Sequence, residues 1–156
     1  MTRQPGEQAV ATNRKARHEY HIDATLEAGL VLMGTEVKAL RAGMASLADG
    51  WVSFSGGQAY LEGVHIPEYV QGSWTNHAPR RKRKLLLHKD QIRKWAAKTG
   101  EAGFTVVPLR LYFVGGRAKV EIALARGKRD WDKRQALRER QDNLEARRAM
   151  RSRTFR

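Results

Sequence analysis

Hydrophobic and polar residues alternate along two pairs of short segments, and two glycines separate the members of each pair. The first pair spans residues 51–62 around Gly56-Gly57, and the second spans residues 109–124 around Gly115-Gly116. Alternation with a period of two is typical of half-buried strands, and both central positions of a tight turn favour glycine because they need positive φ. Each pair is therefore predicted to form an antiparallel hairpin.

In the second hairpin the large apolar side chains recur at every other position. They are Leu109, Leu111 and Phe113 on the outgoing strand and Val120, Ile122 and Leu124 on the returning strand. Mostly polar residues lie between them, as in an antiparallel sheet with one side on a core. We expect each strand to turn one apolar face toward that core.

The remaining pattern predicts two helices and further strands. Residues 35–42 have a helical pattern that ends at Gly43, which can adopt the left-handed conformation at a helix C-terminus. Residues 88–99 also carry apolar side chains at helical spacing. Short apolar runs at 30–32 and 85–87 suit further strands. Many short strands with few helices predict a mainly β fold, a small closed β-barrel with flanking short helices.

The barrel is expected to occupy residues 13–125, between two segments that lack its alternation. Residues 1–12 are polar, contain Pro5-Gly6, and are predicted to be a flexible leader. Residues 126–156 are rich in arginine and lysine and carry few large apolar side chains, so we expect a basic tail that is disordered when free and waits for a polyanionic partner. A helix there would be marginal in isolation, because favourable surface pairs contribute only about 0.2–0.5 kcal/mol each.

The overall charge indicates the same kind of partner. The net charge is +14 on 156 residues and the pI is about 10.8, beyond the value of about 9 that is typical of nucleic-acid-binding domains. An anionic membrane is the other abundant polyanion, but the tail lacks the apolar face of an interfacial helix. No apolar run approaches the roughly 18 residues of a spanning helix, and we see no secretory signal. We therefore expect a soluble, cytoplasmic protein with no membrane partner.

The chain offers little for catalysis or for metal binding. It has no cysteine, which excludes thiolate chemistry and cysteine-based zinc sites. His18 and His21 lie near Glu19 but lack a third ligand, and no glycine-rich loop joins a strand to a helix. A ribonuclease that uses histidine and lysine needs no fixed motif, but nothing here supports one. We predict that the protein is not an enzyme and has no metal and no cofactor.

Two basic stretches are candidates for contact with nucleic acid. The cluster 80–84 directly precedes a predicted strand and is interpreted as an RNA-binding surface, with a solvated loop as the alternative. Trp131 lies between Lys128-Arg129 and Lys133-Arg134. We expect its indole to stay exposed until a base stacks on it, a contact of about 1–3 kcal/mol. The alternative is that Trp131 packs on the barrel.

Glu27 and Glu36 are acidic residues in an otherwise basic context. The simpler interpretation of each is an intramolecular pair with a nearby lysine or arginine. In an RNA site, a carboxylate would instead orient an arginine or accept a hydrogen bond from a base amino group.

Several longer blocks of sequence carry a specific resemblance. They are 13–20 (NRKARHEY), 27–30 (EAGL), 34–43 (GTEVKALRAG), 83–88 (RKLLLH), 107–112 (VPLRLY), 126–129 (RGKR) and 132–134 (DKR). In this order they resemble the signature segments of bacterial small protein B, the SsrA-binding protein family. The resemblance covers nearly all of the chain from Asn13 onward.

The resemblance implies an oligonucleotide-binding-type barrel that binds the tRNA-like domain of transfer-messenger RNA and delivers it to stalled ribosomes for trans-translation. Carried over by position, the RNA-binding residues are Asn13, Glu27, Lys38, Arg41, Lys84, Leu86 and Lys119. The tail would become helical in the empty messenger channel, where it would contact chiefly small-subunit ribosomal RNA near the decoding centre. The tail residues implied in this contact are Gly127, Lys128, Arg129, Trp131, Asp132, Lys133, Arg134 and Met150. A general RNA chaperone or ribosome-assembly factor is the alternative function.

Overall fold

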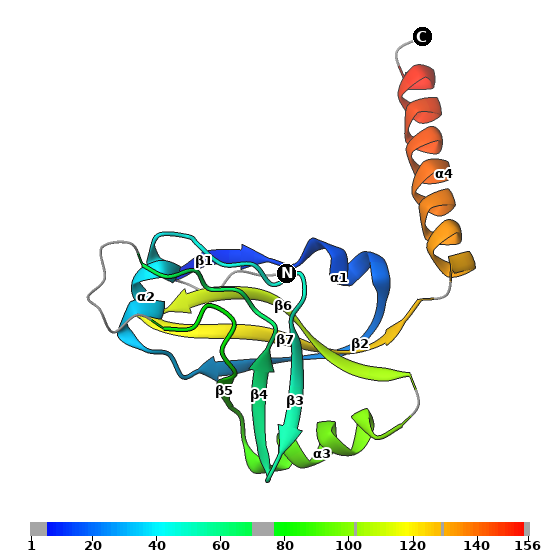
Figure 1. Cartoon of the computed structure of the whole chain (residues 1–156). Coiled ribbons are helices and arrows are strands. Elements are labelled where there is room, and N and C mark those ends of the chain that lie inside the picture. Colours follow the sequence, from blue (N-terminus) through cyan, green and yellow to red (C-terminus); the bar gives the residue numbers. More distant parts are fainter. Residues whose placement is uncertain (1–5, 70–76, 102, 129, 155–156) are drawn as a thin grey trace.

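The computed structural model describes residues 6–69, 77–101, 103–128 and 130–154. Its strands are β1 (Glu7–Thr12), β2 (Tyr20–Leu30), β3 (Trp51–Ser55), β4 (Gln58–Glu62), β5 (Arg83–Leu86), β6 (Phe104–Val114) and β7 (Arg117–Gly127). Its helices are α1 (Arg14–Glu19), α2 (Gly34–Arg41), α3 (Lys89–Thr99) and α4 (Asp130–Thr154). All strand pairs are antiparallel and join into one sheet in the order β1-β6-β7-β2-β5-β4-β3 (Figure 1).

Both predicted hairpins are confirmed. β3 and β4 pair directly around Gly56-Gly57, and β6 and β7 pair around Gly115-Gly116. All four glycines have positive φ, between 56° and 78°, which residues with a Cβ rarely adopt. The second hairpin is longer than predicted, because its strands extend to Phe104 and Gly127.

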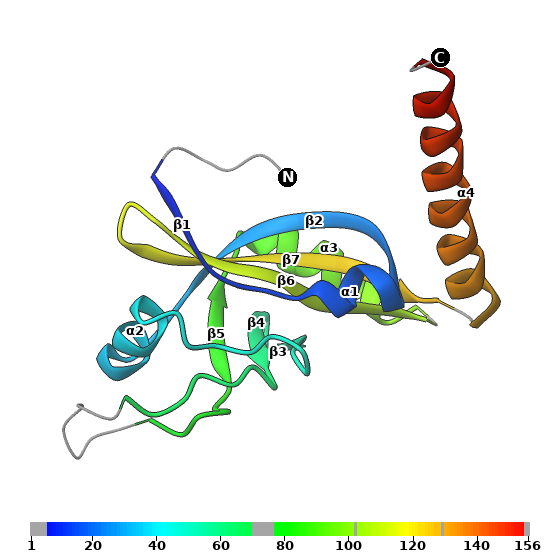
Figure 2. The ribbon, with the colours of Figure 1, turned by 90° about the horizontal axis from the view of Figure 1, so that it is seen from above.

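The predicted closed barrel is not confirmed. Among the described strands, hydrogen-bonded pairing runs from β1 to β3 without joining these two ends of the sheet. Seen from above, β3, β4 and β5 cross beneath the long strands β2, β6 and β7 (Figure 2). The fold is therefore mainly β, a strongly curved antiparallel sheet with short helices at its borders.

The flexible leader was wrongly predicted for residues 7–12. They form β1, which pairs with β6 from Glu7 opposite Val114 to Thr12 opposite Arg110. The pairing partner lies about a hundred positions further along the chain, so the local pattern of this polar segment gave no sign of it.

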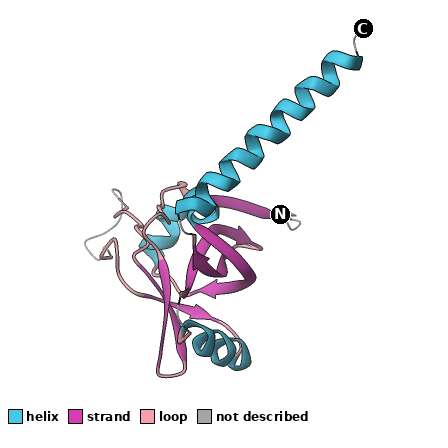
Figure 3. Cartoon of the chain, turned by 90° about the vertical axis from the view of Figure 1, so that its right-hand side faces the viewer, coloured by secondary structure: helices cyan, strands magenta, loops and turns pink. Residues whose placement is uncertain are grey.

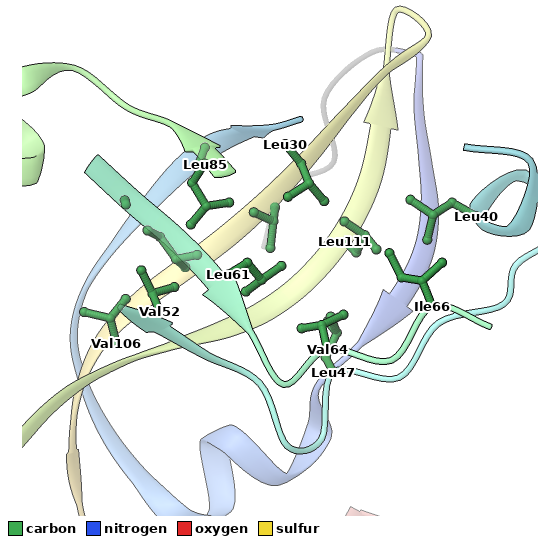
Figure 4. Packing of buried hydrophobic residues seen from close by; sticks show 14 of the residues in the cluster. Leu30, Leu40, Leu47, Val52, Leu61, Val64, Ile66, Leu85, Val106 and Leu111 are labelled. Atoms are coloured by element: carbon green, nitrogen blue, oxygen red, sulfur yellow. The ribbon is translucent and has the colours of Figure 1, made fainter. Parts of the chain in front are cut away.

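The main core lies inside the curve of the sheet. Leu30, Leu61, Leu85 and Leu111 come from four strands and lie between the ribbons in Figure 4, and all four are buried in one apolar cluster. α2 adds Leu40 and α3 adds Trp95 to the same cluster. These helices therefore cover the open parts of the sheet rather than forming a separate layer.

A second, smaller core lies on the other side of the sheet under α1. It contains Ala16, Val107, Leu109, Ala123 and Ala125. A bulge between Pro108 and Arg110 separates Leu109 from Leu111 and Phe113, which face the main core. The prediction of one shared face for these three residues was therefore wrong, because a bulge reverses the alternation of sides along a strand.

Both predicted helices between the strands are confirmed within one residue at either end. α2 spans Gly34–Arg41 and is followed by Gly43 with φ of +77°, as expected for a helix terminus. α3 spans Lys89–Thr99 and buries Ile92 and Trp95. The predicted strand at 85–87 corresponds to β5, whereas the predicted strand at 30–32 is only the end of the long β2.

The basic tail is a helix in this structure. α4 runs for 25 residues and projects away from the sheet (Figures 1 and 3). Its described side chains, from Leu137 to Arg151, are all exposed. The run of alanine, leucine, arginine, glutamate and glutamine, which are strong helix formers, favours this helix, and disorder of the free tail stays a prediction. The length also exceeds the 12–15 residues below which isolated helices are marginal.

Candidate nucleic-acid interface

Four of the predicted RNA-binding residues meet at one hollow on the outer face of the sheet. Glu27, Lys84, Leu86 and Lys119 come from three adjacent strands, β2, β5 and β7, and line a cavity of about 390 Å³. Gly29 lies at the centre, because it pairs with Leu86 on one side and Lys119 on the other. The hollow combines an apolar side chain with charges of both signs.

Because residue 29 is a glycine, the Leu86 side chain can pack close to the sheet and remain exposed to solvent. A Cβ at position 29 would lie 3.2 Å from Leu86 Cβ and 3.3 Å from its Cδ1, closer than normal packing. The Leu86 side chain nevertheless remains 55% exposed. Beside Lys84 and Lys119, this leucine gives the hollow an apolar surface that suits a partner with flat apolar faces and negative charge. Gly29 was not predicted as a site residue.

A buried tyrosine fixes the carboxylate of Glu27. Tyr112 is only 1% exposed, and its hydroxyl donates a hydrogen bond to Glu27. Burial and this carboxylate raise the pKa of Tyr112, so its proton stays available as donor. Arg110 stacks over the tyrosine ring at 4.2 Å and also forms ion pairs with Glu7 and Glu121. Tyr112 was not predicted as a site residue. Its position on β6, opposite Lys119 on β7, connects it to the first hollow.

A second hollow adjoins the first, and α2 lines it with Val37. It also measures about 390 Å³ and is lined by Gly29, Leu30, Leu32, Val37, Leu86, Phe113, Gly116, Arg117, Ala118 and Lys119. Arg41 stacks on Phe113 at 5.0 Å, and Lys38 lies 5.9 Å from the Tyr69 ring. Neither Lys38 nor Arg41 lines either hollow, but Arg41 packs on Phe113 in the wall of the second hollow.

Asn13 has a structural position away from both hollows. Its side-chain amide donates to the Pro108 carbonyl at 3.0 Å and to the Leu47 carbonyl at 3.4 Å, and its backbone N–H donates to Leu109 at 2.7 Å. The side chain is buried between these segments. In this structure Asn13 joins β1, the loop before β3 and β6, and its contact with RNA stays a prediction.

Much of the basic cluster 80–84 is not a free surface. Arg83 is fully buried, pairs with Glu36, and donates to the Val64 carbonyl at 2.9 Å and to the Pro79 carbonyl at 3.0 Å. Arg81 donates to Glu36 from its Nε at 3.0 Å. For Glu36, the intramolecular ion pair is therefore the correct interpretation.

The charge state of Glu36 follows from these contacts. Burial by itself would raise the pKa of this carboxyl group, but hydrogen bonds from Arg81, the Met33 N–H and Arg83 together outweigh it and lower the pKa. The Met33 N–H lies 2.8 Å from Glu36 Oε1. The contacts of Glu36 with Arg81 and Arg83 join the start of α2 to β5 and to the segment before it. They therefore hold α2 against the sheet.

Two lysines of the cluster do remain on the outer face. Lys84 lines the first hollow, and Lys82 lies 4.3 Å from the ring of Tyr60. Arg80 instead donates to the Gly63 carbonyl at 2.9 Å and lies 3.8 Å from Asp49. The prediction of an RNA-binding surface can therefore apply to Lys82, Lys84 and the exposed Arg80, but not to the buried Arg83.

The predicted tail residues span the junction and the length of α4. Gly127 ends β7 opposite Tyr20, and Lys128 donates its N–H to Glu19 at 2.9 Å. These bonds anchor the start of the tail to the sheet. Arg129 lies outside the described residues, as do the side chains of Trp131, Asp132, Lys133 and Arg134. Met150, near the far end of α4, is 70% exposed.

Neither a metal centre nor a membrane span is found in the part of the chain that the structure describes. Within these residues, no group of three or more histidine, aspartate or glutamate side chains is placed to hold a metal ion. Of the helices described, none combines the length and the apolar character needed to cross a bilayer.

A curved, basic β-sheet with hollows on its outer face and a projecting cationic helix defines a class of protein built to hold a structured polyanion. Comparison with known proteins identifies the family within that class. The family model described as SmpB protein matches residues 10–152, so the chain belongs to the SmpB family.

Individual relatives agree over nearly the whole chain. The SsrA-binding protein of Kineococcus radiotolerans is 65% identical over 150 residues, covering 96% of each chain. That of Leifsonia xyli is 65% identical over 153 residues, covering 98% of this chain and 97% of the relative. A solved structure described as "tmRNA-SmpB: a journey to the center of the bacterial ribosome" is 48% identical, with a TM-score of 0.68 over 84% of this chain and 96% of the other.

Proposed function

We propose that this protein binds the tRNA-like domain of transfer-messenger RNA and delivers it to stalled ribosomes for trans-translation. Family membership and the names of the relatives support this function. The observation that carries it is the convergence of Glu27, Lys84, Leu86 and Lys119 on one hollow.

Each side chain at the first hollow has a defined role in this proposal. Leu86 offers an apolar surface to an unstacked base, and the lysines neutralise neighbouring phosphates. Glu27, oriented by Tyr112, accepts a hydrogen bond from a base amino group. Lys38 and Arg41 continue the positive surface along α2. The curved sheet acts as an oligonucleotide-binding-type platform that reads RNA shape and splayed bases more than duplex sequence.

The basic tail has a separate task in this proposal. On the ribosome, α4 enters the empty messenger channel and contacts small-subunit ribosomal RNA, with Trp131 near the decoding centre and Met150 as a late apolar contact. A messenger already in the channel would exclude the helix sterically. We place the protein in the cytoplasm and assign it binding without catalysis.

A titration of labelled tRNA-like-domain RNA tests the proposal. Leu86→Ala and Lys119→Ala should each weaken binding by at least about fivefold, because loss of a base contact or of a charged hydrogen bond costs about 1–3 kcal/mol. Lys98→Ala is the matched control, since Lys98 is an exposed cation on α3 that pairs with Glu101. Its affinity should stay within about twofold of the unaltered protein.

The choice of RNA separates the alternative function. If unrelated structured RNAs of equal length bound as tightly as the tRNA-like domain, a general RNA chaperone would explain the data and the proposal would fail. Equal affinities of the Leu86 variant and the control would show that the first hollow does not bind the RNA.

A further inference from the structure

A third hollow lies where the tip of the β3–β4 hairpin approaches α3 (Figures 1 and 3). It measures about 540 Å³ and is lined by Phe54, Ser55, Gly56, Gly57 and Gln58 of the hairpin and by Lys89, Ile92, Arg93 and Ala96 of α3. This volume falls in the range of sites for small organic groups, about 300–1,000 Å³. We call it the α3 groove.

The walls of the α3 groove have two distinct characters. Phe54, Ile92 and Ala96 supply an apolar wall that is buried or half-buried. Lys89 and Arg93 stand one helical turn apart on the exposed rim. Neither cation has an ion pair with another described residue, and no acidic side chain is among the lining residues. The groove is therefore complementary to a flat apolar group that carries a negative charge.

The α3 groove adjoins the first hollow. Gln58 lines both cavities. His88, which directly precedes α3, and Gln91 line the first hollow, whereas Lys89 and Ile92 line the groove. A polyanion that covers the first hollow therefore reaches the groove by passing over Gln58. A chain of nucleotides fits this path, because it brings bases and phosphates in regular alternation.

We propose that the α3 groove holds an unpaired nucleotide of the same RNA that occupies the first hollow. The base lies against the wall formed by Phe54, Ile92 and Ala96, and its flanking phosphates pair with Lys89 and Arg93. This inference rests on the proposed function and extends its RNA surface from the middle of the sheet to α3. An acidic peptide is the competing occupant, but the shared border with the first hollow at Gln58 favours RNA.

Charge reversal on two faces of α3 tests the phosphate contacts. The groove variant is Lys89→Glu with Arg93→Glu, and the matched control is Lys94→Glu with Lys98→Glu on the same helix. Both lower the net charge by the same amount and keep the spacing of four residues. Circular dichroism and thermal unfolding check that both remain folded. Affinity for the tRNA-like-domain RNA is then measured between 50 and 200 mM salt.

The salt dependence gives the expected result. Loss of two phosphate contacts should reduce the slope of log K against log salt by about 1.4–1.8. Raising the salt from 50 to 200 mM should weaken RNA binding by both variants. The factor of weakening should be about 7- to 12-fold smaller for the groove variant than for the control. At 50 mM salt it should also bind more weakly than the control. Equal slopes and affinities for the two variants would overturn the inference.

Ala96→Leu tests the base separately, because it fills the groove and leaves both cations in place. Binding should weaken by at least about fivefold, the low end for losing one base–aromatic contact, with the salt slope unchanged. Unchanged affinity would overturn the proposed base site. If the unaltered protein did not prefer the tRNA-like RNA, and Lys119→Ala had no effect, the proposed function itself would have failed. If only the groove variants left the RNA affinity and its salt dependence unchanged, this inference alone would have failed.

Discussion

Replacement of Glu36 by glutamine should be among the most damaging single changes in the protein. The carboxylate is fully buried, and it is the partner of the fully buried Arg83 and of the half-buried Arg81. Glutamine keeps the size and loses the charge, so Arg83 is left as an unpaired charge in the interior. Breaking such a buried pair costs about 3–5 kcal/mol. For a chain of this size the melting temperature should fall by about 6–20 °C.

The pH dependence adds a second, independent signature. Because the folded-state pKa of Glu36 lies below its ordinary value of 4.5, its stabilising contribution is complete above pH 4.5 and is lost as the pH falls through the folded value. The difference in unfolding free energy between the original protein and Glu36→Gln should therefore be constant near neutral pH and shrink in acid. Denaturant titrations at several pH values measure it.

The matched control is Glu101→Gln, which neutralises an exposed carboxylate paired with Lys98. Its effect should stay below about 1 kcal/mol, as for other surface ion pairs. The reasoning would be refuted if Glu36→Gln cost no more than the control at pH 7. It would also be refuted if the two proteins differed equally at acid and neutral pH.

Two further outcomes follow from the first hollow. Gly29→Val should displace Leu86, since a Cβ at position 29 would lie 3.2 Å from Leu86 Cβ. Affinity for the tRNA-like RNA should fall by at least about fivefold, and an unchanged dissociation constant would contradict the tight packing. Tyr112→Phe should cost about 1.5–3 kcal/mol in unfolding free energy, because it removes a hydrogen bond to the Glu27 carboxylate. Because the pKa of Tyr112 is raised above 10.0, the original protein should lose stability as the pH rises above that value, and the variant should lack this loss; identical alkaline unfolding curves would argue against the hydrogen bond.

The hairpins and the inner helices could be predicted because their signals are local. Gly56-Gly57 and Gly115-Gly116 specify the turns, and the alternation beside them specifies the strands. β1 could not be predicted this way, since its hydrogen bonds depend on a strand about a hundred residues away. The bulge that turns Leu109 to the second core is likewise a property of pairing and not of the pattern.

The candidate site divides in the same manner. The resemblance placed Glu27, Lys84, Leu86 and Lys119, and the sheet brings them together. Residue type alone could not distinguish Arg83, which is buried, from Lys84 beside it, which faces the hollow. The alternation of a strand separates the two, but only once the register of β5 is known.

The central claim is that the sheet alone holds the RNA while α4 acts only on the ribosome. Deletion of residues 130–156 tests it most directly, with binding of the tRNA-like RNA at 200 mM salt and tagging of stalled peptides measured on the same protein. The account predicts a dissociation constant within about threefold of the full chain, because the phosphate contacts of the sheet remain, together with complete loss of tagging. Loss of RNA binding together with tagging would contradict it.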